Sequence, residues 1–272
     1  MKLQGIFAEI TTPFDHKGDI YKTKVEHNVE KWNRTTLAGY VVCGRAGEGT
    51  LLAAEEKSAV WEMVAKYAAP EKLLIAAAGM PGVRESVVLA NRAADLGYKA
   101  ALVDVPYRAA ETQLAYFRAV ADQSRIPVIA GGANSDVAAA VAQHPNIVAL
   151  CGDVGKAAGP SIDVVARSAT HLWPALQSGA AGAILDFAAA APYACIAIWE
   201  AHRTREEEAG IDWQNRILRA AELIGECRHG VAGLKHAMDL NAYYGGPPRL
   251  PLVVPGAEAR RELEEAFGAF KG

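Results

Sequence analysis

Eight short apolar segments recur along the chain, and each is followed by a stretch with helical spacing. The segments span residues 5–11, 39–43, 73–79, 100–105, 127–131, 147–151, 163–167 and 182–187. In the intervening stretches, such as 53–68 and 111–123, apolar residues return every three or four positions and charges fill the opposite face. A strand followed by a helix, repeated eight times, predicts a (β/α)8 barrel of the α/β class.

The part of the chain after Pro192 has a different pattern, because helical segments follow one another there with no obvious strand between them. They span residues 192–210, 212–227 and 230–245, and a loop rich in Gly and Pro (245–259) leads into a last helix over 257–270. We therefore predict two parts. Residues 1–192 form the barrel, and residues 193–272 form a C-terminal helical extension packed on it.

Charge and apolar content restrict the partners. Of the 272 residues, 51% are hydrophobic and 22% are charged, which is enough apolar material for a large buried core. The net charge of -3 comes from interleaved acidic and basic residues, so we expect no nucleic acid or membrane partner. Residues 179–199 are long enough to span a bilayer, but Asp186 and Pro192 favour a buried strand followed by a proline-started helix.

The cysteines indicate a reducing environment. Cys43, Cys151, Cys195 and Cys227 are widely spaced, with no CxxC pair and no Cys/His cluster at zinc-ligand spacing. At the N-terminus no basic segment followed by a long apolar segment is evident, so no signal peptide is indicated. We predict reduced thiols and a cytoplasmic location.

Four separated segments resemble, in order and in spacing, the dihydrodipicolinate synthase and N-acetylneuraminate lyase family of barrel aldolases. They are GIFAEITTPFDHKGDI (5–20), GYVVCGRAGEGTLLAAEEK (39–57), HPNIVAL (144–150) and GGPPRLPLVV (245–254). The resemblance covers nearly the whole chain and implies the same barrel with its helical extension. It says less about activity, because one fold carries many reactions.

The resemblance implies a specific chemistry at the end of the sixth strand. In the family a lysine there forms a Schiff base with pyruvate or a related 2-oxo acid, and the iminium draws electrons from the adjacent carbon. Here Cys151 holds that position. A thiol adds to a ketone to give a neutral hemithioketal with no positive nitrogen, so Cys151 cannot replace the lysine.

Other family positions differ as well. The loop after the second strand, where the resemblance implies two hydroxyls that bind the substrate carboxylate, reads GRAGE (44–48). Gly131 stands where the family has a proton-shuttling tyrosine, and an arginine of the following loop has no clear counterpart. After the fourth strand Tyr107 is kept and Arg108 replaces a second tyrosine. We therefore expect no authentic dihydrodipicolinate synthase activity.

A substrate pocket is predicted at the barrel mouth from residues that the resemblance places there: Gly44, Arg45, Tyr107, Arg108 and Cys151. Guanidinium groups suit carboxylates and phosphates, so Arg45 and Arg108 favour a small anionic metabolite; the alternative is two solvated surface arginines. Cys151 is either an apolar filler or a reactive, ligand-contacting thiol. Nearby arginines would lower its pKa below about 8.5.

Two replacements for the family lysine stay open. Lys156, in a Gly-rich loop, is a candidate for a relocated Schiff-base lysine. A divalent metal is the other, with ligands drawn from Asp104, Asp153, Asp186, Glu48 and His171. No HxH or ExxH spacing gathers these residues, so we predict neither a metal nor a cofactor. We interpret Glu48 as a brace for its loop and Lys235 as structural.

The sequence thus predicts a diverged family member, a lyase or aldolase-type enzyme that acts on a small oxo acid or other anionic metabolite without a lysine Schiff base. Its catalytic residues stay unassigned. The alternative is a catalytically inactive small-molecule-binding or regulatory protein on the same fold.

We predict a homodimer or homotetramer, because the resemblance implies barrels that pair across helical and loop surfaces, with Arg108 near a subunit interface. Sedimentation velocity at micromolar concentration checks this, and a monomer would contradict it.

Overall fold

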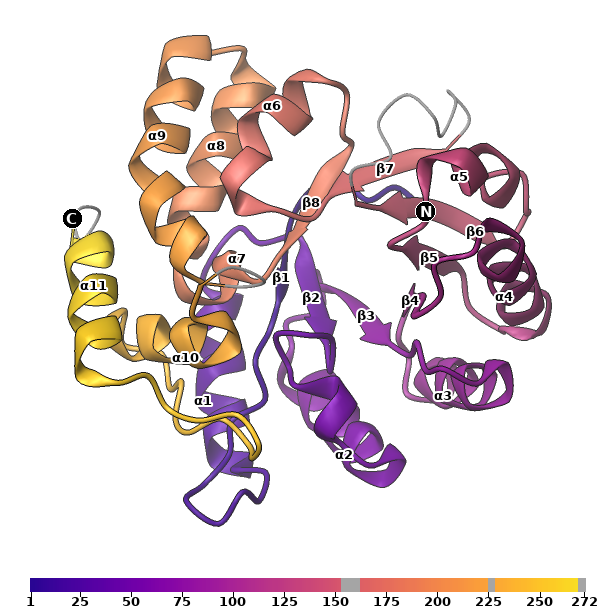
Figure 1. Cartoon of the computed structure of the whole chain (residues 1–272), viewed down its shortest axis with the longest axis horizontal. Helices are drawn as coiled ribbons and strands as arrows, with labels where there is room; N and C mark the ends of the chain where they lie inside the picture. Colours follow the sequence, from indigo (N-terminus) through magenta and orange to yellow (C-terminus); the bar gives the residue numbers. More distant parts are fainter. Residues whose placement is uncertain (153–161, 225–227, 269–272) are drawn as a thin grey trace.

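The computed structural model describes residues 1–152, 162–224 and 228–268, and its centre is a closed barrel of eight parallel strands in sequence order (Figure 1). The strands are β1 (Gly5–Glu9), β2 (Gly39–Val42), β3 (Leu73–Ala77), β4 (Ala100–Asp104), β5 (Val128–Gly131), β6 (Ile147–Cys151), β7 (Asp163–Ala166) and β8 (Gly182–Leu185). Every predicted apolar segment contains one strand. The predicted (β/α)8 barrel is confirmed.

Helices surround the barrel. They are α1 (Lys22–Asn33), α2 (Ala54–Tyr67), α3 (Val83–Asp95), α4 (Ala110–Gln123), α5 (Ser135–Val141), α6 (Leu172–Gln177), α7 (Phe187–Ala190) and α8 (Pro192–Thr204). The prediction of one helix over 192–210 is wrong at the C-terminal end of that helix, which stops at Thr204. Arg205 adopts a left-handed conformation (φ 64°) that ends α8, and residues from Glu207 onward belong to the next helix.

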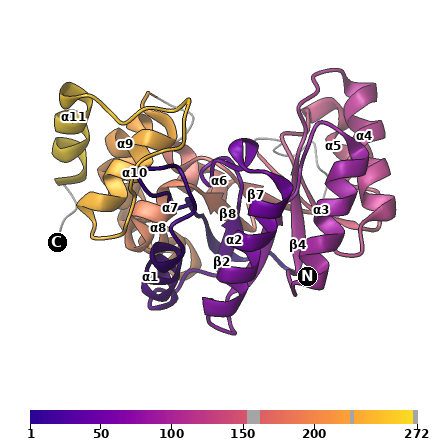
Figure 2. The same ribbon diagram turned by 90° about the horizontal axis from the view of Figure 1, so that it is seen from below.

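The C-terminal helices α9 (Glu207–Leu223), α10 (Gly230–Leu240) and α11 (Ala257–Gly268) gather on one flank, opposite α3 and α4 (Figures 1 and 2). Helix α9 packs on α8, and α10 packs on α7 and α11. The predicted boundary between the barrel and the C-terminal extension, at 192/193, falls at the first residue of α8. This division into two parts stays a prediction. Residues 179–199 fold into β8, α7 and part of α8, and no described helix is long and apolar enough to cross a membrane.

Two apolar cores hold the barrel together. The inner one fills the barrel with side chains that alternate along the strands, such as Phe7, Leu102 and Ile184. The outer one lies between the sheet and the helices. In it Trp61 of α2 is fully buried, its ring centroid lies 6.0 Å from that of Tyr98, and its indole N–H donates to the Val42 carbonyl (3.2 Å).

Replacing Trp61 with alanine removes a large buried ring and leaves a cavity between α2 and the sheet. We expect Trp61→Ala to lower the free energy of unfolding by about 3–5 kcal/mol, measured by urea denaturation. Val88→Ala is the matched control, because Val88 is 61% exposed, and its effect should stay within about 0.5 kcal/mol. Equal losses in the two variants would show that Trp61 is not a core residue.

Candidate functional site

Polar side chains form a ring at the carboxyl ends of the strands. Residues two apart on a strand point to the same side, so the inner apolar layer is followed by a second inward-facing layer at the mouth. Five apolar residues, Phe7, Leu102, Ala149, Val165 and Ile184, are each followed two positions later by Glu9, Asp104, Cys151, Arg167 and Asp186. The carboxyl ends of barrel strands are where active sites of this fold lie.

An ion pair between Arg167 and Asp104 crosses this ring. Arg167 donates two hydrogen bonds to the Asp104 carboxylate, and the bond from Nη2 to Oδ2 is 2.7 Å long. The Arg167 side chain is 12% exposed, and its Nη2 also lies 4.0 Å from Oε2 of the buried Glu9. Burial acts to raise the pKa of Asp104, but the Arg167 guanidinium outweighs it and holds that pKa below its usual value.

This ion pair fills the space beside Gly131. A Cβ at Gly131 would lie 2.1 Å from Oδ1 of Asp104 and 3.0 Å from Nη1 of Arg167. Gly131 pairs in register with both Asp104 and Cys151 on the neighbouring strands. Position 131 therefore has no room for a side chain while the pair is in place.

Cys151 is buried in the inner core, with 1% of its surface exposed. The expected lowering of its pKa is wrong. Burial raises the pKa of Cys151 to about 12, and the opposing charges of Arg167 and Arg45 do not offset it. The thiol is protonated at neutral pH, as the filler interpretation requires.

Glu9 fixes the loop after β2 to the barrel. Its Oε1 accepts a hydrogen bond from the backbone N–H of Ala46 (3.3 Å). A Cβ at Gly44 would lie only 2.2 Å from the same oxygen, so glycine is required for this close approach. The loop that carries Arg45 is thereby held over the mouth.

Glu48 fixes the other end of this loop to the C-terminal extension. It adopts a left-handed conformation (φ 55°) and is buried. Its Oε1 lies 2.5 Å from Nζ of Lys235, and its Oε2 accepts from the backbone N–H of Arg249 (2.7 Å). Lys235 also donates to the Thr12 carbonyl (2.9 Å). These contacts agree with Glu48 as a brace and Lys235 as a structural residue.

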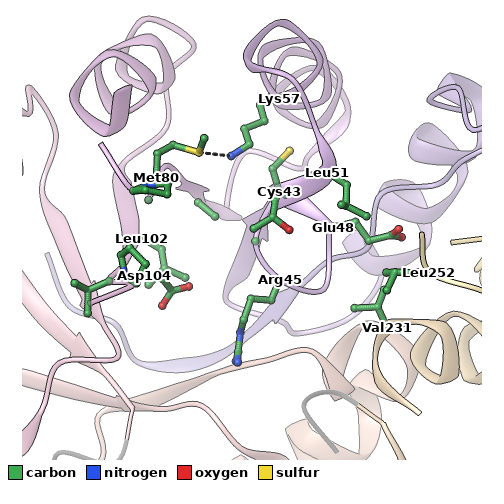
Figure 3. Close-up of a pocket in the computed structure, with 18 of the residues that line it drawn as sticks. Cys43, Arg45, Glu48, Leu51, Lys57, Met80, Leu102, Asp104, Val231 and Leu252 are labelled. Atoms are coloured by element: carbon green, nitrogen blue, oxygen red, sulfur yellow. Dashed lines mark hydrogen bonds between the residues drawn. The ribbon is translucent and has the colours of Figure 1, made fainter. Parts of the chain in front are cut away.

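A pocket of about 480 Å³ lies beside the ring, between the β2 and β4 ends and the C-terminal loop (Figure 3). Gly44 and Arg45 line it, and Arg45 is exposed; that they bind substrate stays a prediction. Cys151, Tyr107 and Arg108 are not among the described lining residues.

Tyr107 and Arg108 lie on the loop after β4. The Tyr107 hydroxyl donates to the Pro81 carbonyl (2.6 Å). Arg108 is exposed, and its carbonyl accepts from Asn134 (2.8 Å). The structure therefore brings Gly44 and Arg45 together at the pocket and leaves the other three predicted residues outside its lining.

The acidic candidates separate into different environments. Asp186 accepts a hydrogen bond from the N–H of Phe187 (2.7 Å), while burial and the charge of Glu9 raise its pKa. His171 is exposed and contacts Thr170. Asp153 and Lys156 lie outside the described residues. Within the described part of the chain, no three His, Cys, Asp or Glu side chains gather in a metal-binding arrangement.

Three residues of this region were not predicted from the sequence: Glu9, Arg167 and Lys57. The period of two along each strand could have indicated Glu9 and Arg167, because each lies two positions beyond an inward-facing apolar residue. Lys57 lines the pocket and is 2% exposed. Lys57 lies three, four and seven positions before the buried Val60, Trp61 and Val64 of α2. This helical spacing could have indicated that the Lys57 side chain lies on the buried face of the helix.

Comparison with known proteins decides the family. The family model described as the dihydrodipicolinate synthetase family matches residues 2–269. The chain belongs to this family. The resemblance seen in four segments of the sequence is confirmed over almost the whole length.

Individual relatives of the family carry different names. The chain is 32% identical to a probable mitochondrial 4-hydroxy-2-oxoglutarate aldolase of Emericella nidulans, over 97% of this chain and 93% of that protein. It is 30% identical to L-threo-3-deoxy-hexylosonate aldolase of Hypocrea jecorina, over 91% of this chain and 90% of that one. The crystal structure of a dihydrodipicolinate synthase from Bacillus anthracis superposes with a TM-score of 0.91, at 21% identity and full coverage of both chains.

The Arg167–Asp104 pair can be tested by a double-mutant cycle. Arg167→Met leaves the Asp104 and Glu9 carboxylates without their shared cation, so we expect a loss of up to about 3 kcal/mol in the free energy of unfolding; Asp104 remains partly exposed, which limits the loss. Adding Asp104→Leu should restore part of it, measured by urea denaturation.

Arg92→Met is the matched control for this cycle. Arg92 forms an exposed ion pair with Glu62, and breaking such a pair costs less than about 1 kcal/mol. Additive losses in the Arg167/Asp104 double variant would show that the two residues do not stabilise each other.

Proposed function

We propose that the protein is a lyase or aldolase-type enzyme that acts on a small oxo acid or other anionic metabolite without a lysine Schiff base. Family membership and the aldolase names of the relatives support lyase chemistry on oxo acids. Strand β6 contains no lysine, and its terminal Cys151 is buried and protonated. Arg45 at the pocket supplies a cation for an anionic substrate.

The observation that carries this proposal is the carboxylate of Asp104 at the pocket in the barrel mouth. Asp104, at the end of β4, has a lowered pKa because of Arg167, whereas Asp186, just after β8, has a raised pKa because of burial and Glu9. An ionised carboxylate can accept the proton of a substrate hydroxyl, whereas Asp186 is not among the described lining residues of the pocket. Asp104 also lines the pocket.

These groups fit the cleavage of a 4-hydroxy-2-oxo acid. A base takes the proton of the 4-hydroxyl, the bond between C3 and C4 breaks, and its electron pair moves through C3 onto the C2 carbonyl oxygen. An aldehyde leaves, and the enolate gains a proton at C3 to give the second oxo acid. In this proposal Asp104 is the base, it returns the same proton to C3 of the enolate, and the guanidinium of Arg45 stabilises the enolate oxygen.

The alternative function is binding or regulation without turnover. The Arg167–Asp104 pair supports it, because these two side chains fill the barrel mouth beside Gly131 and above the inner core. Either activity is proposed to belong to a cytoplasmic homo-oligomer, with Arg108 near a subunit interface.

Turnover and borohydride trapping, measured in parallel samples, test the proposed enzyme. One sample is incubated with 4-hydroxy-2-oxoglutarate alone and aldehyde release is followed, and a second is treated with the same compound and borohydride before its intact mass is measured. We expect cleavage in the first sample and an unchanged protein mass in the second, because no iminium forms. A reductive adduct mapped to Lys156 or Lys57 would contradict the mechanism, and binding without cleavage would favour the regulatory alternative.

Arg45 and Arg108 provide a matched pair of variants for the same assay. Arg45→Met should lower kcat/KM at least tenfold, about 1.4 kcal/mol, whereas Arg108→Met, on a residue outside the pocket lining, should retain activity in the assembled protein. Equal losses would contradict the assignment of Arg45 as the anion-binding residue.

A further inference from the structure

A second cavity, of about 360 Å³, lies in the C-terminal extension. It is lined by α10, by α11, by the loop 241–256 that joins them and by the loop after β1. The joining loop extends past α1 toward α2 (Figure 1) and contributes to both cavities: Pro248 and Val254 line this one, and Pro251 and Leu252 line the pocket of Figure 3. The two cavities have no described lining residue in common. Small-molecule sites typically have volumes of about 300–1,000 Å³.

Rings and small apolar groups form much of the lining. The joining loop supplies the phenol ring of Tyr244, the pyrrolidine rings of Pro247, Pro248 and Pro255, and the side chain of Val254. Flat apolar surfaces of this kind suit a ring-bearing ligand better than a fully polar one. The lining therefore favours a ligand with an apolar ring.

Hydrogen bonds hold the joining loop in place around the cavity. The N–H of Gly245 donates to Oδ1 of Asp239 (2.8 Å), and Nζ of the buried Lys235 donates to the Pro247 carbonyl (3.1 Å). A ligand would therefore not have to order this loop on binding, which lowers the entropic cost of association.

The basic side chains that line the cavity come from three elements. His236 belongs to α10, Arg260 to α11, and His16 to the loop after β1. Asp239 is the one acidic residue among the described lining residues, and its Oδ1 already accepts the hydrogen bond from Gly245. The balance of charge in the lining favours an anion.

Arg260 is the side chain best suited to hold that anion. Its Nε donates to the Pro255 carbonyl (2.9 Å), which fixes the guanidinium beside the cavity. The ion pairs that α11 forms within the described part of the chain use its glutamates, and none of them includes Arg260. The two terminal nitrogens of this guanidinium have the fork geometry that matches a carboxylate.

His236 contributes a polar atom without a hydrogen bond. Its Nε2 is buried, and it lies 3.6 Å from Oε1 of Glu264, which is too far for a hydrogen bond. Buried polar atoms without a partner are uncommon, because each costs stability. The lining thus includes an imidazole whose hydrogen-bonding capacity is unused among the described residues.

We propose that this cavity binds a small aromatic carboxylate, with the ring against Tyr244 and the prolines and the carboxylate paired with Arg260. The site is separate from the candidate active site, and the proposal does not depend on the proposed function. An anion without a ring would leave the apolar lining uncovered. A neutral aromatic compound would leave the guanidinium without a carboxylate.

Three probes test the ligand class. Phenylacetate carries both features, acetate lacks the ring, and phenylacetamide lacks the charge; isothermal titration calorimetry measures the binding of each. We expect the wild-type protein to bind phenylacetate with a Kd below about 1 mM and the other two at least tenfold more weakly. Phenylacetate binding no tighter than that of either comparison compound would overturn the proposal, and so would the absence of phenylacetate binding at about 1 mM.

Arg260→Met locates the bound carboxylate. We expect this variant to bind phenylacetate at least tenfold more weakly than the wild type. Arg261→Met is the matched control, because Arg261 is the next residue of the same helix, is also exposed and does not line the cavity; its affinity should not change. A loss of affinity in Arg45→Met but not in Arg260→Met would place phenylacetate in the pocket of Figure 3 and overturn the proposal.

Val254→Asp tests the sign of the charge at the same site. Val254 lines the cavity and is 51% exposed, so the variant is expected to fold, and its carboxylate should weaken phenylacetate binding at least tenfold. Val253→Asp is its control, because Val253 is 70% exposed and outside the lining. Equal affinities of these two variants would contradict the proposed site. If Arg260→Met does not fold, this pair of variants decides.

Discussion

The buried ion pair between Glu48 and Lys235 joins the two ends of the molecule. Glu48 belongs to the loop after β2, and Lys235 to a C-terminal helix, α10. The second oxygen of Glu48 holds the backbone of Arg249, whose guanidinium binds Glu56 of α2 at 2.6 and 2.8 Å. Because Pro251 and Leu252 follow in the same loop and line the pocket, this junction fixes one wall of the pocket.

The charged side chains at the mouth of the barrel lie in two places. Glu9, Asp104 and Arg167 lie together, so the centre of the barrel is closed and electrostatically balanced. The pocket beside it contains the buried Lys57 and the exposed Arg45. The cavity is therefore displaced from the barrel axis toward the β2 and β3 side, where α2 and the C-terminal loop form the walls. This displacement separates the predicted site at Cys151 from the observed cavity.

The fold could be predicted because it depends on repeated patterns. Apolar segments of the right length located all eight strands, and the break at Arg205 was missed because a left-handed residue without glycine has no local signature. The site was predicted only in part. Gly44 and Arg45 were found through the resemblance, whereas Glu9 and Arg167 appeared as ordinary charges beside strands. Lys57 was overlooked because a lysine on an amphipathic helix is normally assigned to its solvent face, although its spacing from Val60, Trp61 and Val64 places it on the buried one.

Gly131 and Cys151 are both constrained by the ion pair between Arg167 and Asp104. A lysine introduced at position 151 would place a second cation in the buried region beside Arg167, and a tyrosine at position 131 would occupy the volume of the Asp104 carboxylate. Positions 131 and 151 are therefore coupled to the ion pair across the mouth, and the side chains that either position accepts depend on the residues at 104 and 167.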